Sequence, residues 1–321
     1  MLPEVRGWLR RRTSSAGDWP VRDLAAAKGA TSVSVVLPAR DERDTIGDII
    51  GVIRRELGRI VDEIVVIDSR SCDDTARVAA RAGATVYAQD EILPRLEPLD
   101  GKGEALWKSL AVTYGDVLAF VDADIRKFHA SLVCGVLGPL LADPTVVYAK
   151  GCYDRPLHGS PNAGGRVTEL VARPLINLHW PLLAGFVQPL AGEYAGRRSA
   201  LERVPFLTGY GVELGLLIDL LDLAGLDAFA QVDLGSREHC PQSTEALGGM
   251  AGQIMLAAWS RLRRQGKIEC CHEPSVCLTQ FRRCETGHEA VDRDIQIAER
   301  PPMITVPELT SRGVPARATH R

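Results

Sequence analysis

The sequence has little that would bring the protein to a membrane or to nucleic acid. No stretch of its 321 residues approaches the roughly 18 consecutive apolar residues that a membrane helix needs. A net charge of −3 leaves no general basic field for nucleic acid. The N-terminal arginines precede no apolar signal-peptide core, so we expect a cytoplasmic protein whose eight cysteines are reduced thiols.

The motifs that mark several familiar nucleotide and zinc sites are also missing. After the first predicted strand the chain reads Pro38-Ala-Arg-Asp-Glu42. This is neither Gly-x-Gly-x-x-Gly nor a Walker A loop, and it is not the Gly-rich, Arg-containing loop of a nucleotidyltransferase. The Cys and His residues between Cys270 and His288 lack the paired C-x-x-C spacing of structural zinc sites. We expect these thiols to be reduced and packed under a C-terminal loop.

Strands and helices are predicted to alternate through the first part of the chain. Apolar runs predict strands at residues 31–37, 63–68, 83–87 and 117–121. Helical spacing predicts helices at residues 45–57, 75–82 and 104–114. Such alternation is typical of an α/β fold with a mostly parallel central sheet flanked by helices.

Beyond residue 145 the pattern loosens but shows no linker or repeat. Further strands are expected at 146–150 and 229–234, and helices at 212–223 and 248–263. We therefore expect a single domain over residues 31–298. A short helical extension at 1–30 precedes it, and a Pro-, Arg- and Thr-rich tail at 299–321 is expected to be frayed.

Two aspartates follow the most apolar predicted strand, in Val117-Leu-Ala-Phe-Val-Asp-Ala-Asp124. Open α/β sheets bind ligands at the carboxyl ends of their strands. Residues i and i+2 of an extended chain point the same way, so Asp122 and Asp124 can face one crevice. Two carboxylates there suit Mg²⁺ or Mn²⁺ carrying a diphosphate. A solvated turn with acidic caps is the alternative.

Other polar residues lie at neighbouring strand ends or between glycines. Asp41 or Glu42 can accept hydrogen bonds from a base or ribose, or can cap the next helix. Asp68 and Ser69 follow the second predicted strand in the same way. Lys102 lies between Gly101 and Gly103, where it can place a charge on a phosphate or simply be solvated at a helix start.

Taken together, these segments resemble the GT-A nucleotide-sugar glycosyltransferases, through Pro38–Glu42, Asp68-Ser69, Gly101–Leu106 and Phe120–Asp124. The second half is similar to the glucosyl-3-phosphoglycerate synthase family, through Gly164–Glu169, Pro189–Tyr194, Gly209–Gly215 and Gln231–Gly235. The resemblance implies a GT-A, Rossmann-like fold and a retaining transferase. It also implies UDP-glucose as the donor and Mg²⁺ or Mn²⁺ as the cofactor.

The resemblance also implies roles for individual residues. The donor half, about residues 31–150, would bind the nucleotide sugar, and Leu190 from the second half would join it. The donor-binding residues would be Pro38, Ala39, Arg40, Glu42, Ser69, Lys102, Asp122, Ala123 and Leu190. The catalytic residues would be Lys102, Asp122, Asp124 and Glu213, and the metal ligands Asp124 and His239. The acceptor half, about residues 151–298, would hold a phosphate or carboxylate through Gly165, Arg166, Thr168 and Arg237.

The chain departs from this family directly after His239. Family members that use 3-phosphoglycerate continue with an Arg-Asn-Arg-Pro segment, whereas this chain reads Cys240-Pro-Gln242. Part of the expected positive charge beside the acceptor is therefore absent, and the acceptor's identity stays open.

The function expected from these features is transfer of glucose from a nucleotide sugar to a small phosphorylated or carboxylated acceptor such as 3-phosphoglycerate. We expect the enzyme to be a homodimer. One alternative is the same donor chemistry on another acceptor in a specialised pathway. Another is a non-catalytic nucleotide-sugar-binding protein, although such a protein needs no lysine to activate a leaving group.

Overall fold

The computed structural model describes residues 1–155, 164–237, 242–269, 272–285 and 287–310. The helices are α1 (Pro3–Arg12), α2 (Val21–Ala27), α3 (Ile46–Leu57), α4 (Thr75–Ala82), α5 (Lys102–Val112), α6 (Ala130–Ala142), α7 (Arg173–His179), α8 (Arg198–Leu201), α9 (Val212–Ala224), α10 (Thr244–Arg264) and α11 (Pro307–Thr310). The strands are β1 (Thr13–Ser15), β2 (Val33–Ala39), β3 (Glu63–Asp68), β4 (Thr85–Ala88), β5 (Val117–Phe120), β6 (Tyr148–Asp154), β7 (Tyr194–Arg197), β8 (Phe206–Leu207), β9 (Phe229–Ser236), β10 (Cys277–Cys284), β11 (Gly287–Asp294) and β12 (Glu299–Arg300).

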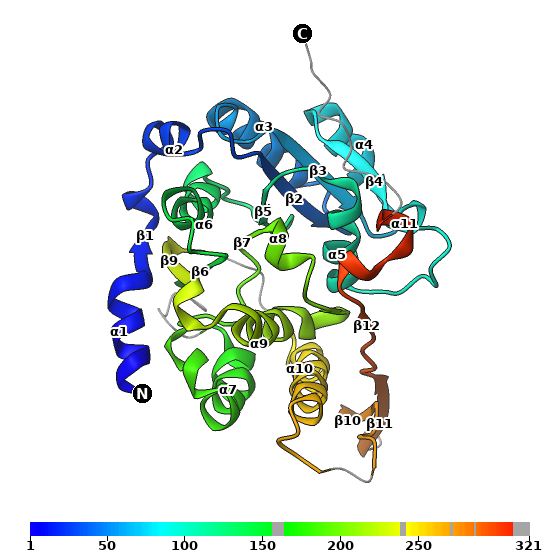
Figure 1. The fold of residues 1–321 in the computed structure, drawn as a ribbon. Helices are drawn as coiled ribbons and strands as arrows, with labels where there is room; N and C mark the ends of the chain where they lie inside the picture. Colours follow the sequence, from blue (N-terminus) through cyan, green and yellow to red (C-terminus); the bar gives the residue numbers. More distant parts are fainter. Residues whose placement is uncertain (156–163, 238–241, 270–271, 286, 311–321) are drawn as a thin grey trace.

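One large sheet forms the centre of the molecule (Figure 1). Its strand order is β1-β9-β6-β7-β5-β2-β3-β4. Only β7 runs antiparallel to its neighbours β5 and β6, and the other described pairs in this sheet are parallel. The predicted α/β fold with a mostly parallel sheet is therefore confirmed. The carboxyl ends of β2, β3, β5, β6 and β9 lie along the same edge of the sheet, as does the start of β7.

Alternating strand residues bury themselves in two separate cores, one on each face of the sheet. Val36 and Leu118 belong to one core, and their chain neighbours Val35 and Ala119 belong to the other. Both sets are fully buried, as expected for strands covered by helices on both sides. On α3, the predicted face from Ile46 to Leu57 is completely buried, which fixes that helix against the second core.

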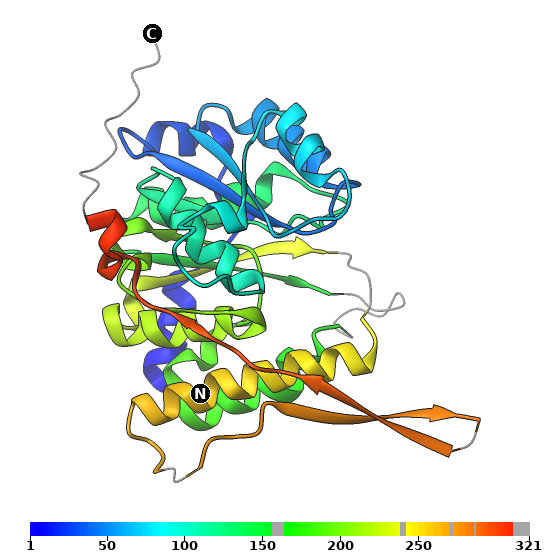
Figure 2. The same cartoon turned by 90° about the vertical axis from the view of Figure 1, so that its right-hand side faces the viewer.

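Several elements were not expected from the sequence, among them α6, β7, β10 and β11. Helix α6 is apolar all round and almost wholly buried, so it shows no amphipathic stripe, and Pro139 lies inside it. Strand β7 is short and reversed. Strands β10 and β11 form a hairpin whose side chains are mostly exposed, and it projects from the body of the molecule (Figure 2). Its stability comes from its own pairing and from the contact with α10.

Both ends of the described chain are built into the fold. Strand β1 adds an edge strand beside β9, and the buried Trp8 of α1 donates a hydrogen bond from Nε1 to the carbonyl of Phe229 at 3.0 Å. Strand β12, in the region expected to be frayed, pairs with β8. Arg300 of β12 is buried against Glu104 of α5. Burial of these side chains explains why the segments are ordered despite their polar composition.

Candidate active site

A cavity of about 620 Å³ lies at the carboxyl edge of the large sheet. Every predicted site residue that the structure describes lines it: Pro38, Ala39, Arg40, Glu42, Ser69, Lys102, Asp122, Ala123, Asp124, Gly165, Arg166, Thr168, Leu190, Glu213 and Arg237. His239 lies outside the described residues. The cavity wall comes from residues directly after β2, β3, β5, β6 and β9, the position at which open α/β sheets bind ligands.

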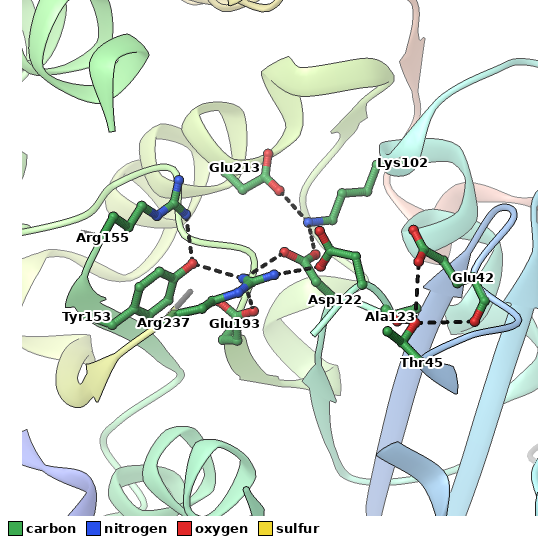
Figure 3. A network of polar contacts seen from close by, with 11 residues as sticks. Glu42, Thr45, Lys102, Asp122, Ala123, Tyr153, Arg155, Glu193, Glu213 and Arg237 are labelled. Carbon is green, nitrogen blue, oxygen red and sulfur yellow. Dashed lines mark hydrogen bonds and ion pairs between the residues drawn. The ribbon is translucent and has the colours of Figure 1, made fainter. Parts of the chain in front are cut away.

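Lys102 bridges two carboxylates in the middle of this cavity (Figure 3). Its Nζ lies 2.5 Å from Asp122 Oδ1 and 3.0 Å from Glu213 Oε1. Burial favours the neutral amine, but the two carboxylates outweigh it and raise the pKa of Lys102. The lysine is therefore a fixed positive charge, and 21% of its side chain is exposed toward the cavity.

Arg237, which follows β9, forms ion pairs with three carboxylates, one of which is Asp122 (Figure 3). One NH group lies 2.5 Å from Glu193 Oε1 and 3.2 Å from Asp122 Oδ2, and the second lies 2.6 Å from Asp124 Oδ1. Burial opposes ionisation of Asp122, but Lys102 and Arg237 outweigh it and hold the pKa of Asp122 well below its usual range. The Asp122 carboxylate is thus ionised and held in place between two cations.

Two glycines let these groups approach one another. A Cβ on Gly192 would overlap the Asp122 carboxylate, and a Cβ on Gly103 would overlap the carbonyl oxygen of Leu207. The start of α5, which carries Lys102, therefore packs directly on the chain after β8. The glycines of the Gly101–Gly103 motif serve this close approach of backbone to backbone.

Glu42 lies on the cavity wall after β2, among the residues predicted to bind the donor. Burial and the neighbouring Asp124 raise the pKa of Glu42 to about 7, against a hydrogen bond from Thr45 that lowers it. The Thr45 hydroxyl is 3.4 Å from Glu42 Oε2 and also donates to the carbonyl of Ala123 at 2.6 Å. The side chain of Glu42 does not cap α3, because no side chain of the described residues makes a capping hydrogen bond at the start of that helix.

The cavity wall that carries the predicted acceptor residues also carries an arginine that sequence reasoning missed. Arg155 follows β6 directly, and one of its NH groups donates to the Tyr153 hydroxyl at 2.7 Å. Arg237 donates to the same hydroxyl at 3.1 Å, so the tyrosine joins the two arginines (Figure 3). Arg166 lies on the wall nearby and donates to the carbonyl of Gln242 at 2.9 Å. The predicted strand ended at residue 150 rather than Asp154, which hid the strand-end position of Arg155.

A buried lysine beneath the cavity was also missed. Lys150 of β6 is 1% exposed, and its Nζ lies 4.6 Å from the centre of the Tyr194 ring and 3.5 Å from the Tyr148 hydroxyl. Burial lowers the pKa of Lys150 to about 7. Its signal in the sequence was a charged residue at the end of the otherwise apolar predicted strand 146–150, whereas Glu193 directly precedes β7, which the sequence did not predict.

The residues present fit a divalent ion of the Mg²⁺ type. The Asp124 side chain is 54% exposed, and its Oδ2 accepts no hydrogen bond from the described residues. No group of three or more potential His, Cys, Asp or Glu ligands occurs in that part of the chain. Beside nucleotides, Mg²⁺ and Mn²⁺ take few ligands from the protein, and phosphates and water supply the remaining ligands.

The two late cysteines that the structure describes are not packed under a loop, contrary to our expectation. Cys277 and Cys284 are both exposed on β10, because the hairpin projects from the body and has little to pack against. Cys270 and Cys271 lie outside the described residues.

In the part of the chain that the structure describes, no helix is long and apolar enough to cross a membrane.

This chain is similar to known proteins over most of its length. The model of glycosyl transferase family 2 matches residues 34–174. Glucosyl-3-phosphoglycerate synthase of Mycolicibacterium smegmatis is 45% identical over 305 residues, which cover 93% of this chain and 98% of the relative. The enzyme of the same name from Petrotoga mobilis is 43% identical, over 88% of this chain and 89% of the relative.

Two solved structures show the same architecture. Mannosyl-3-phosphoglycerate synthase from Rubrobacter xylanophilus superposes with a TM-score of 0.89 at 41% identity, over 94% of this chain and 99% of its own. Glucosyl-3-phosphoglycerate synthase from Mycobacterium tuberculosis, solved with Mn²⁺, UDP and glucosyl-3-phosphoglycerate, has a TM-score of 0.79 at 42% identity. That match covers 89% of this chain and 95% of the solved one.

Proposed function

This chain belongs to the glucosyl-3-phosphoglycerate synthase family, and we propose that it transfers glucose from UDP-glucose to 3-phosphoglycerate. The predicted family, the predicted GT-A fold and the predicted class of enzyme are thereby confirmed. The observation that carries the proposal is the cavity in which Lys102 and two strand-end aspartates converge, within a chain that matches the relatives over almost their full length.

The donor half is proposed to bind UDP-glucose along the ends of β2, β3 and β5. Pro38, Ala39, Arg40 and Glu42 would contact the uridine together with Ser69. Leu190 would contact the sugar. Glu213 is held 3.0 Å from Lys102, and we assign it to the hydroxyl groups of the sugar.

Lys102 is proposed to stabilise the departing UDP. Negative charge grows on the leaving phosphate oxygen as the sugar–phosphate bond breaks, and a fixed ammonium beside it lowers the energy of the transition state. Because the carboxylates keep Lys102 protonated, this charge is available throughout the neutral pH range.

A divalent ion would be held by Asp124, with His239 as a second proposed ligand, and would supply further positive charge to the diphosphate when bound. Mn²⁺ is present in the solved Mycobacterium tuberculosis relative. Asp122 touches both Lys102 and Arg237, and we assign it to positioning Lys102 and the donor.

We propose that the configuration of the sugar is retained. The acceptor oxygen would form its bond to the anomeric carbon on the face from which UDP leaves, and its proton would pass to the leaving UDP oxygen. Glu213 is the buried carboxylate assigned to the sugar, and its ion pair with Lys102 fits a positioning role better than attack on the sugar.

The acceptor half is proposed to hold the anionic acceptor through Gly165, Arg166 and Thr168. Gly165 has a φ of 73°, a conformation that glycine adopts without strain and that opens the backbone toward a ligand. The Arg166 guanidinium offers a planar fork for a phosphate or a carboxylate. Arg237, also predicted at the acceptor, has most of its charge offset by three carboxylates.

We also propose a homodimer that acts in the cytoplasm. The β10–β11 hairpin projects from the body, and its Phe281 is 69% exposed (Figure 2). An apolar side chain at such a position suits a protein contact. Sedimentation of wild type and Phe281→Ser would test the assembly, and a wild-type monomer would refute it. The cytoplasmic location rests on the free thiols of the described residues, which include Cys72 and Cys152.

The transfer activity is tested with purified protein, Mn²⁺ and 3-phosphoglycerate against UDP-glucose, GDP-glucose and GDP-mannose. The mannose donor is included because the Rubrobacter relative has the higher TM-score of the two solved structures described above. We expect glucosyl-3-phosphoglycerate, formed fastest from UDP-glucose. Higher kcat/KM with GDP-mannose would assign the chain to mannosyl transfer instead.

A further inference from the structure

The wall proposed to bind the acceptor holds two arginines, Arg155 and Arg166, whose charges are not offset by any carboxylate of the described residues. Elsewhere in the cavity, Lys102 and Arg237 are each paired with two or more carboxylates. Within the described residues, Arg155 and Arg166 have no carboxylate within ion-pair distance, and their recorded partners are neutral oxygens. Buried or half-buried charges are costly without a partner, so this wall is suited to an anionic ligand.

Arg155 is held in place while keeping donors to spare. Its guanidinium carbon lies 5.0 Å from the centre of the Tyr153 ring, and one NH group is fixed on the hydroxyl of that ring. Its Nε is buried and makes no hydrogen bond with the described residues. A guanidinium has five N–H donors, so several remain for a ligand. An orphaned, buried donor is destabilising, and a bound anion would remove that cost.

Arg155 is also tied to the loop that carries Arg166. The N–H of Gly164 donates to the carbonyl oxygen of Arg155 at 2.9 Å, and Gly164 and Gly165 immediately precede Arg166. Arg155, Arg166 and Thr168 all line the cavity. The backbone contact therefore ties together the two segments that carry these arginines, and both arginines line the same cavity.

We propose that Arg155 is the second cation of the acceptor site and binds one of two anionic groups on the acceptor, while Arg166 binds the other. This inference rests on the proposed function, since 3-phosphoglycerate carries a carboxylate at one end and a phosphate at the other. The arrangement also replaces the positive charge that is absent from Cys240-Pro-Gln242. A doubly anionic acceptor is then selected over one that carries a single anionic group.

The test compares wild type, Arg155→Gln and Arg155→Lys with three acceptors: 3-phosphoglycerate, glycerate and glycerol 3-phosphate. One lost charge-assisted hydrogen bond predicts a rise of about ten- to a hundredfold in the KM of Arg155→Gln for 3-phosphoglycerate. The KM for UDP-glucose should stay within about twofold. One of the two truncated acceptors should be nearly insensitive to the substitution, and it identifies the group that Arg155 binds. Arg155→Lys should restore part of the affinity, because it keeps the charge but loses the fork.

A general structural defect would lower activity equally with all three acceptors or alter the KM for UDP-glucose, and either result would overturn the inference. Unchanged kinetics in Arg155→Gln would overturn it as well. Arg55→Gln is the matched control, since Arg55 is exposed on α3 and pairs only with Glu56 among the described residues.

Calorimetric titration of 3-phosphoglycerate in the presence of UDP and Mn²⁺ separates this inference from the proposed function. If wild type binds 3-phosphoglycerate with Arg155-dependent affinity but transfers no glucose, the proposed function fails and the inference stands. If wild type transfers glucose and Arg155→Gln binds 3-phosphoglycerate normally, the inference alone fails. No binding to wild type would contradict both.

Discussion

Replacing Arg300 by methionine should destabilise the protein severely, although the residue lies in a stretch whose composition indicates a frayed tail. Arg300 is 8% exposed and donates two hydrogen bonds, of 2.7 and 2.8 Å, to the carboxylate of the fully buried Glu104. A third bond reaches the carbonyl of Glu97 at 2.5 Å. Without Arg300, the one ion-pair partner left to Glu104 among the described residues is Lys108, at 3.4 Å.

Removing one partner of a buried ion pair costs about 3–5 kcal/mol, because the other charge is left buried and poorly compensated. Urea unfolding followed by circular dichroism should show a lower midpoint for Arg300→Met with an unchanged slope. The double variant Glu104→Gln with Arg300→Met should recover part of the loss, since it removes both charges. Arg263→Met is the control: its pair with Glu273 is exposed and should contribute less than about 1 kcal/mol. Equal losses for Arg300→Met and Arg263→Met would refute the reasoning.

Three further predictions concern the cavity. Gly192→Ala should displace the Asp122 carboxylate and lower kcat about a hundredfold. The control Gly51→Ala adds a methyl group in open space and should leave kcat unchanged. Equal kcat values for the two variants would contradict the close approach of Gly192 to Asp122. Lys102→Met should lower kcat about 10²- to 10³-fold in steady-state assays with little change in acceptor KM, and near-wild-type kcat would exclude the lysine from leaving-group stabilisation. The pKa of Lys150 is lowered to about 7 by burial, so the wild type loses stability as pH falls from about 10.5 toward 7. Lys150→Met should remove this loss, so in urea titrations its stability relative to wild type should be higher at pH 6.5 than at pH 10. An identical pH dependence of stability in both proteins would show that Lys150 does not contribute to it.

The donor end of the cavity could be read from the sequence because its residues follow clear strands. The apolar run before Asp122 predicts β5 closely, and a carboxyl-terminal strand end is where a parallel sheet binds its ligand. The flanking glycines made Lys102 a candidate, and the family resemblance assigned its role. The structure adds their physical reason, which is the contact between the start of α5 and the chain after β8.

The acceptor end was harder to predict because β6 is irregular. A register shift lies between Cys152 and Asp154, and the strand continues four residues beyond the predicted end at Lys150. Arg155 follows the observed strand directly, but it lies five residues beyond the predicted strand end. Strand β7, which brings Glu193 to Arg237, is short and antiparallel, and its pairing depends on distant segments that no local pattern encodes.

The transfer reaction itself tests the central claim most directly. Purified protein is incubated with UDP-glucose, 3-phosphoglycerate and Mn²⁺, and the product is analysed by NMR, with EDTA as the control. The account predicts glucosyl-3-phosphoglycerate whose anomeric proton has the small coupling of an α-glucoside, and no product with EDTA. A β-linked product would contradict the proposed retention, and the absence of any glucosylated phosphoglycerate would contradict the function.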